Sequence, residues 1–209
     1  FQMYANIDNI DPRNFKVDYN DLEEIDKWLL SKYNNLIKDV TSAYEEYDLN
    51  KVVKNITDFV SEDLSNWYIR RNRQRFWKSA LDNSKKGVYQ VTYEVLIGIT
   101  QLVAPIVPFI TEEIYQNLTD KESVHLSDFP KCNEELINIE LENKMELVRN
   151  LISLGRNVRE ETKIKVRQPL SEVILDGKNE SILSDVVNLI KEELNVKNVL
   201  FVKNITNYM

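Results

Sequence analysis

Apolar residues recur in steps of three or four along most of this chain, and this period limits what the chain can fold into. One such series runs over residues 22–47 and a second over residues 53–67. This spacing is that of one face of an α-helix. Continuing along the chain, we expect the second helix to extend to about residue 86, and two more to cover residues 88–103 and 109–118.

Short connections join these predicted helices, which favours antiparallel neighbours. Pro105 and Pro108 separate the third helix from the fourth, because proline cannot donate to the helical ladder. A further long helix is expected to end at Arg159. The sequence therefore predicts a mainly α protein with an antiparallel helix bundle over residues 20–160, in which the first helix starts at Asn20.

The ends of the chain follow other patterns. Residues 1–19 show little periodicity, and we interpret them as a leading segment from a larger body. The chain starts at Phe1, which we interpret as the start of a piece of a longer protein. After residue 160 short alternating and apolar runs at 164–167, 173–175 and 199–202 surround an amphipathic stretch at 181–194. We expect a small α/β subdomain over residues 161–209.

Composition narrows the function classes. The chain has 209 residues and a net charge of -7 from 27 basic and 34 acidic residues. This charge argues against a protein that wraps nucleic acid over its whole surface, but it allows a local basic patch. The single cysteine excludes an intrachain disulfide and suits a reducing, cytoplasmic location. No apolar run is long enough to span a membrane, so no membrane partner is expected.

One basic stretch, residues 66–77, stands out within the second helix. It holds four arginines and two of the three tryptophans. Arginine suits phosphate, and aromatic rings stack on unpaired bases, so this mixture favours RNA. The alternative is a helix end whose arginines pair with nearby carboxylates. The RNA-binding candidates here are Trp67, Arg70, Arg71, Arg73, Arg75, Trp77 and Lys78.

The two tryptophans cannot both be expected on one surface. Trp67 and Trp77 are ten residues apart, about 15 Å along a helix, and lean toward opposite faces. We therefore expect at least one of them in the core. A second basic cluster, diluted by two glutamates, follows the last long helix and adds further RNA-binding candidates: Arg156, Arg159, Lys163, Lys165 and Arg167.

No catalytic constellation is found in the sequence. The four glycines are scattered, so there is no phosphate-binding loop. One histidine, His125, and one cysteine, Cys132, support neither a catalytic triad nor a zinc site. We expect a helical binding module without a metal, cofactor or catalytic residue of its own.

Four stretches together resemble the C-terminal region of class I aminoacyl-tRNA synthetases. They are residues 22–36, 66–77, 102–115 and 164–170. The third is shared by the isoleucine, valine, leucine and methionine enzymes, and 66–77 and 164–170 are most similar to the isoleucine enzymes. The resemblance extends over nearly the whole chain, to about Val202.

The resemblance implies a helical anticodon-binding domain followed by a small mixed α/β part. It implies a parent that attaches isoleucine to its tRNA using ATP with magnesium. The partners would be isoleucine tRNA and the catalytic domain of the same chain, in a monomer. The His-x-Gly-His and Lys-Met-Ser-Lys-Ser motifs of that chemistry are missing here, as is the editing domain. This chain would therefore bind tRNA without catalysing a reaction.

Three alternatives remain open. The chain could be the corresponding region of a valine enzyme, against which the arginine-rich run argues. It could be a helical protein-interaction module, which the salt dependence of RNA binding would distinguish. The arginines of the basic stretch could also brace the bundle through salt bridges, and for each residue we weigh bracing equally with RNA contact.

Overall fold

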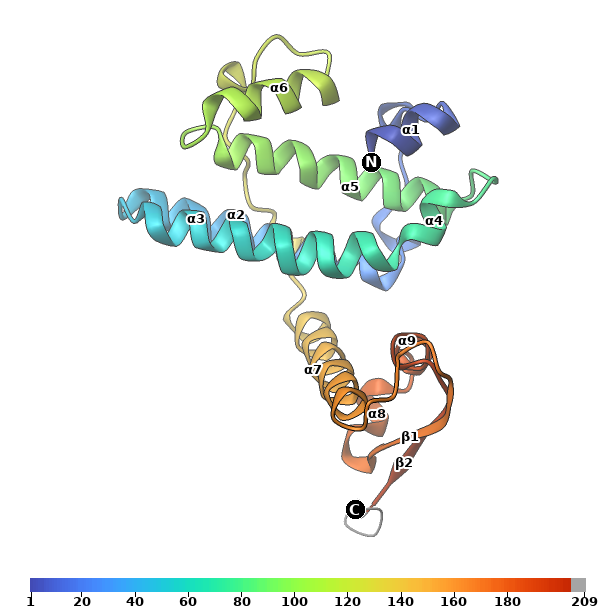
Figure 1. Ribbon diagram of the computed structural model, residues 1–209. Coiled ribbons are helices and arrows are strands. Elements are labelled where there is room, and N and C mark those ends of the chain that lie inside the picture. Colours follow the sequence, from blue (N-terminus) through green and yellow to red (C-terminus); the bar gives the residue numbers. More distant parts are fainter. Residues whose placement is uncertain (204–209) are drawn as a thin grey trace. The chain divides into compact units, whose positions relative to one another are not determined.

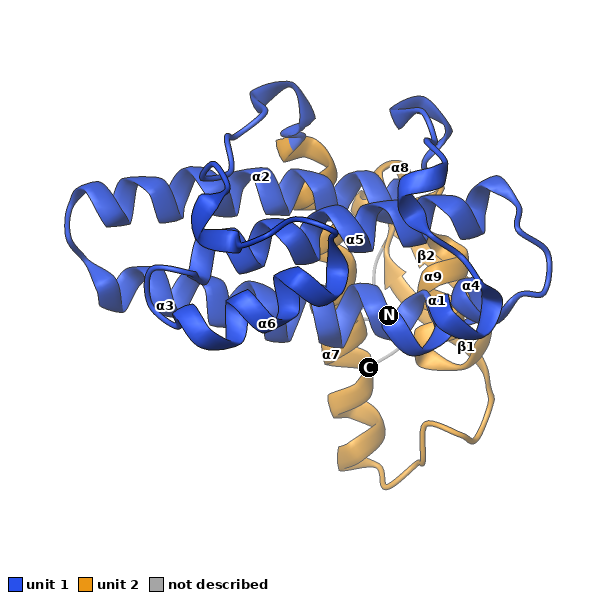
Figure 2. Ribbon diagram, turned by 90° about the horizontal axis from the view of Figure 1, so that it is seen from above, with its two compact units in different colours: residues 1–138 blue, residues 139–209 orange. Residues whose placement is uncertain are grey.

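A computed structural model describes residues 1–203 of the chain. It divides into two compact units, residues 1–138 and residues 139–209, shown in blue and orange in Figure 2. The predicted fold class, mainly α with a small α/β part, is confirmed. Among the described residues no helix is both long and apolar enough to cross a membrane.

The first unit is helical. Its longer elements are α1 (Gln2–Asp8), α2 (Glu24–Glu45), α3 (Leu49–Asp58), η3 (Phe59–Ile69), α4 (Arg73–Trp77), α5 (Asn83–Val103) and α6 (Pro108–Leu118). Helix α2 packs against α3, η3 and α5, and α6 packs against α5 (Figure 1). Apolar side chains from these contacts form the core, including the fully buried Trp28, Val52 and Val88.

Helix α2 begins four residues after the predicted Asn20. Residues Tyr19–Asp21 instead form a short 3₁₀ turn. Glu23 and Asp26 then form a capping box, in which the Glu23 amide donates to Asp26 Oδ2 at 3.2 Å. This reciprocal pair satisfies backbone groups that a helix start leaves open, so it sets the boundary.

The second predicted helix is interrupted, contrary to the expectation of one helix to residue 86. Helix α4 ends at Trp77, and α5 begins at Asn83 with the Asp82 carboxylate accepting from the Lys85 amide at 2.8 Å. Gly87 lies inside α5, where a Cβ would be only 3.3 Å from Asp26 Oδ2 on α2. This glycine therefore permits close packing on α2 and does not end a helix.

Residues 1–19, interpreted from the sequence as a leading segment, fold onto the bundle. Asp8 of α1 accepts from the buried Lys85 Nζ at 2.6 Å. The amide of Val17 donates to Gln90 Oε1 at 2.7 Å, and the Gln90 side chain donates back to the Val17 carbonyl at 3.1 Å. These long-range bonds make the segment part of the first unit.

The second unit contains α7 (Ile139–Glu161), β1 (Leu170–Asp176), α8 (Glu180–Leu183), α9 (Val187–Leu194) and β2 (Val196–Val202). The two strands are parallel, with Val173 opposite Val199 and Leu175 opposite Phe201. Helix α7 packs against α8 and α9. It therefore groups with the α/β unit, whereas the sequence pattern placed it in the bundle and drew the boundary at residue 160.

Two local patterns of this unit fold differently from what the sequence suggests. The alternating run at 164–167 forms no strand, because the Gln168 amide donates to the Lys165 carbonyl at 2.9 Å and closes a turn. The helix predicted over 181–194 is divided into α8 and α9. The last residues assigned to the α/β subdomain, 204–209, lie outside the described part of the chain.

Candidate nucleic-acid interface

Arg75 lies in the core of the first unit. Its guanidinium forms a bidentate ion pair with the Asp26 carboxylate, with Nη1–Oδ1 at 2.8 Å and Nη2–Oδ2 at 2.7 Å. Nη1 also donates to Asn72 Oδ1 at 3.0 Å, while Nε and Nη2 donate to the hydroxyl and carbonyl oxygens of Ser84 at 2.9 and 2.6 Å. A guanidinium has five N–H groups, and all five are therefore used. The RNA contact predicted for Arg75 is wrong, and this residue braces the bundle.

The carboxylate of Asp26 has two further donors. The Tyr68 hydroxyl donates to Oδ1 at 2.6 Å, and the Glu23 amide donates to Oδ2. Burial, together with the Asp26 charge, raises the pKa of Tyr68 well above its ordinary value of 10. Burial opposes the charge on Arg75, but the bonds to Asp26 outweigh it and raise the pKa of Arg75. This charged cluster fixes α4 against α2 and α5.

Trp67 is also a core residue, with 5% of its surface exposed, so the base stacking predicted for it is wrong. The guanidinium of Arg70 lies 5.9 Å from the Trp67 ring, and its Nε donates to the Asn66 carbonyl at 2.8 Å. Arg70 and Arg71 are half-buried, and both interact with other residues of the chain. This part of the basic stretch therefore packs inward.

The outward-facing part of the stretch is what we call the Trp77 surface, made of Tyr4, Arg73, Trp77 and Lys78. Trp77 is 58% exposed, and its ring centroid lies 6.3 Å from that of Tyr4 on α1. Arg73 is exposed four positions before Trp77 on α4, and within the described residues it makes no hydrogen bond or ion pair. Lys78 is exposed and pairs with Asp82 at 3.4 Å. The exposed ring of Trp77 and the exposed cations Arg73 and Lys78 therefore belong to one short part of the chain, at α4 and directly after it.

Tyr4 was missed by the sequence reasoning. Its neighbourhood has too short a periodic run to indicate a helix, and its partners lie some seventy positions away in the sequence. Its ring centroid also lies 6.4 Å from that of Phe76, which is buried. This contact ties α1 to α4 and places Tyr4 beside Trp77.

The second basic cluster is also divided by burial. Arg159 is 4% exposed and donates to main-chain carbonyls, and Arg156 pairs with the buried carboxylate of Glu193. The RNA contact predicted for Arg159 is therefore wrong, and Arg156 is occupied by an internal partner. The other predicted residues of this cluster are exposed: Lys163, Lys165 and Arg167.

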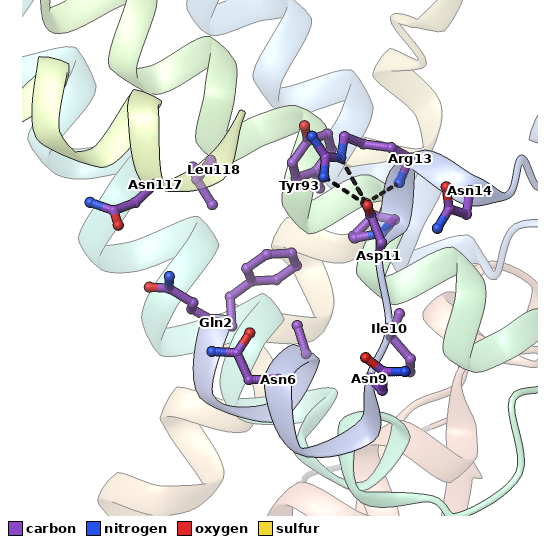
Figure 3. A pocket seen from close by; sticks show the side chains of 13 residues that line it. Gln2, Asn6, Asn9, Ile10, Asp11, Arg13, Asn14, Tyr93, Asn117 and Leu118 are labelled. Atoms are coloured by element: carbon purple, nitrogen blue, oxygen red, sulfur yellow. Dashed lines mark hydrogen bonds and ion pairs between the residues drawn. The ribbon is translucent and has the colours of Figure 1, made fainter. Parts of the chain in front are cut away.

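The first unit has a cavity of about 680 Å³ between α1, α5, α6 and the turn Pro12–Asn14 (Figure 3). Amide side chains dominate the part of the wall that Figure 3 labels, including Gln2, Asn6 and Asn117. Arg13 faces the cavity but is paired with Asp11, at 2.8 Å between Nη2 and Oδ2. That pairing lowers the pKa of Asp11. The described lining contains no histidine, cysteine or serine.

The family model described as the anticodon-binding domain of tRNA ligase matches residues 26–174. The chain belongs to this family. The match begins at Asp26, the carboxylate that holds Arg75, and runs through the basic stretch into β1. The resemblance noted in the sequence is thereby confirmed.

Several curated relatives of this anticodon-binding domain are isoleucine–tRNA ligases. The chain is 42% identical over 215 residues to the isoleucine–tRNA ligase of Clostridium tetani. This alignment covers 100% of the chain and 20% of the relative. The chain is 42% identical over 214 residues to that of Chlamydia trachomatis serovar L2, with the same coverage. With that of Pyrococcus furiosus it shares 40% identity over 204 residues, or 94% of the chain and 19% of the relative. The chain thus spans about a fifth of the length of these relatives.

Proposed function

We propose that this chain is the tRNA-binding part of an isoleucine–tRNA ligase, and that the Trp77 surface contacts unpaired anticodon bases. The observation that carries the proposal is the exposed Trp77 ring, flanked by Tyr4 and by the cations of Arg73 and Lys78. Single-stranded bases stack on aromatic side chains, while nearby cations pair with the phosphates. Each such stack contributes about 1–3 kcal/mol to binding.

The internal ion pair supports this proposal. The bond between Arg75 and Asp26 fixes the backbone of helix α4, which carries Trp77 and Arg73. A binding group held by packing and supporting hydrogen bonds pays a smaller entropic cost. In this proposal the arginines of one motif have two roles, because Arg75 supports the surface and Arg73 belongs to it.

The wider function is also a proposal. The longer parent would attach isoleucine to its tRNA using ATP and magnesium, in the cytoplasm, as a monomer whose catalytic domain is a partner of this region. The motifs of that chemistry are missing from this sequence, which has a single histidine. The described residues would therefore supply RNA recognition, and no step of the reaction would take place on them.

The test is a binding titration of the chain with isoleucine tRNA, valine tRNA and an isoleucine tRNA carrying a swapped anticodon. Preference for the native isoleucine anticodon supports the proposal, while preference for valine tRNA would favour the valine enzyme. The variant Trp77→Ala should weaken the native complex by about 5- to 150-fold, the equivalent of one lost stack. The matched control is Phe109→Ala, since Phe109 is 91% exposed on α6 and lies outside the basic stretch.

Two results would refute the assignment. If both variants bind alike, Trp77 is not a stacking platform. If binding to all three RNAs is absent even at low salt, recognition by this chain alone is wrong. Binding of tRNA that does not weaken with salt would argue against contacts to its phosphates.

A further inference from the structure

Arg159 in the second unit is a buried arginine whose bonds go to the main chain. Its Nη1 donates to the carbonyls of Lys165 at 3.2 Å and Gln168 at 3.0 Å. Its Nη2 donates to the carbonyls of Leu194 at 2.6 Å and Asn195 at 3.2 Å. A cation also stabilises the carbonyl end of a helix, and Leu194 is the last residue of α9. One side chain therefore joins the connection between α7 and β1, residues 162–169, to the end of α9. We call this connection segment 162–169.

Asn195 reinforces the same connection. It adopts the left-handed conformation that ends α9, with φ 49°. Its side-chain amide donates to the Val166 carbonyl at 2.9 Å, and its own carbonyl accepts from the Leu170 amide at 3.1 Å. Together with the bond from Gln168 to Lys165, these contacts hold three carbonyls of the segment in place. The backbone of the segment is thus fixed although its side chains are exposed.

The segment presents cations without internal partners. Lys163, Lys165 and Arg167 are all exposed, and none of them forms an ion pair or side-chain hydrogen bond with a residue that the structure describes. Two other cations of the same unit are paired, Arg156 with Glu193 and Lys144 with Asp185. Glu160 and Glu161 precede the segment and are exposed; the Lys163 amide donates to the Glu160 carbonyl at 3.0 Å, but neither carboxylate pairs with a cation of the segment among the described residues. Three unpaired charges therefore lie on one rigid segment of an otherwise acidic chain.

The chemistry of the segment fits the phosphate backbone of RNA. Residues 162–169 contain no aromatic side chain on which a base could stack. Phosphate contacts set the position of a nucleic acid and carry no sequence information. Within residues 162–169 the exposed apolar groups are Val166 and Pro169, and a cavity of about 440 Å³, lined in part by Val158 and Ile164, lies beside the segment.

We propose that segment 162–169 is a pre-organised phosphate-binding loop for tRNA and that Arg159 is its positioning residue. The inference rests on the proposed function and deepens it, because it assigns the second unit to the RNA backbone while the Trp77 surface contacts bases. The loop contributes equally to the binding of every tRNA. Arg159 does not contact RNA and acts through the carbonyls that it holds.

The test compares two double variants of the whole chain. Lys165→Ala with Arg167→Ala removes two loop cations, and Lys178→Ala with Lys197→Ala removes two exposed cations outside the loop in the same unit. The affinity for native and anticodon-swapped isoleucine tRNA is measured at several salt concentrations. Each lost phosphate contact should reduce the slope of log K against log salt by about 0.7–0.9. The slope for the loop variant should therefore be smaller by about 1.4–1.8 with both RNAs. The slope for the control variant should be unchanged.

Arg159→Lys tests the positioning role, because lysine keeps the charge but cannot form the same four bonds. It should weaken binding to both RNAs while amide exchange in residues 164–170 becomes faster. Normal binding despite faster exchange would overturn the positioning role. If this variant does not fold, the loop variant still decides the phosphate contact.

The outcomes separate the two proposals. Equal slopes of log K against log salt for the loop and control variants overturn the phosphate-binding loop and leave the proposal for the Trp77 surface intact. The exposed cations of this segment would then be available to a protein partner. If the loop variant shows the expected smaller slope while Trp77→Ala binds like the unsubstituted chain, the base contact is overturned and the phosphate-binding loop is retained. Absence of tRNA binding by the unsubstituted chain overturns both.

Discussion

Replacing Arg75 by methionine removes the charge at the centre of the bundle while keeping a long side chain. In the structure Asp26 is 0% exposed and receives two short bonds from this guanidinium. After the substitution the buried carboxylate keeps only the Tyr68 hydroxyl and the Glu23 amide as donors. The change therefore leaves a buried, poorly compensated charge.

The expected loss of stability is large. Breaking one side of a buried ion pair costs about 3–5 kcal/mol. Two hydrogen bonds to a charged group, at about 1.5–3 kcal/mol each, give a similar figure. A domain is stable by about 5–15 kcal/mol, so the first unit should lose about a fifth of its stability or more. At about 2–4 °C per kcal/mol, its melting temperature should fall by about 6–20 °C.

The assay is urea unfolding followed by tryptophan fluorescence. All three tryptophans lie in residues 1–138, so their fluorescence reports the first unit separately from the second. The matched control is Lys78→Met, which removes an exposed ion pair with Asp82 in the same stretch. An exposed pair contributes about 0–1 kcal/mol, so the control should unfold almost like the unsubstituted chain.

A double variant gives a second check. Combining Arg75→Met with Asp26→Leu removes the buried charge as well, so the double variant should be more stable than Arg75→Met alone. The bracing role would be refuted if Arg75→Met cost no more than Lys78→Met. Weaker tRNA binding with unchanged stability would reinstate Arg75 as an RNA contact.

Three further outcomes are expected in the first unit. Gly98→Ala should cost about 1–3 kcal/mol by urea unfolding, because a Cβ there would overlap the buried Tyr33 phenol, and a neutral result would contradict this packing. Tyr115→Phe should change stability by less than about 0.5 kcal/mol or increase it, since the buried hydroxyl has no hydrogen-bond partner among the described residues, and a clear loss would reveal one. The free energy of unfolding should fall as pH rises above 10. Burial raises the pKa values of Tyr33 and Tyr68 in the folded state. Their neutral side chains therefore contribute full stability below pH 10, and this contribution is lost as pH rises toward the folded-state pKa values. Urea midpoints that stay constant above pH 10 would argue against this expectation.

Some elements were predictable because their signal is local. Helix α6 begins at Pro108 and ends at Leu118, close to the predicted 109–118, because proline is tolerated in the first turn of a helix. The parallel strands β1 and β2 contain the two apolar runs predicted at 173–175 and 199–202. The break between α4 and α5 was missed, because its cause is the cap at Asp82, and the local pattern there remains compatible with a helix.

The candidate site was predictable only as a region. The sequence by itself determined that arginine and tryptophan gather in residues 66–77, that the chain is mainly helical and that it resembles a tRNA-binding family. It did not determine which arginine faces outward, because that depends on partners far away in the sequence. Asp26 lies 49 positions from Arg75, and the carbonyl of Leu194 lies 35 positions from Arg159. Only tertiary packing brings such partners within hydrogen-bond distance, and packing alone decided that the donors of Arg75 are already used while Arg73 remains available.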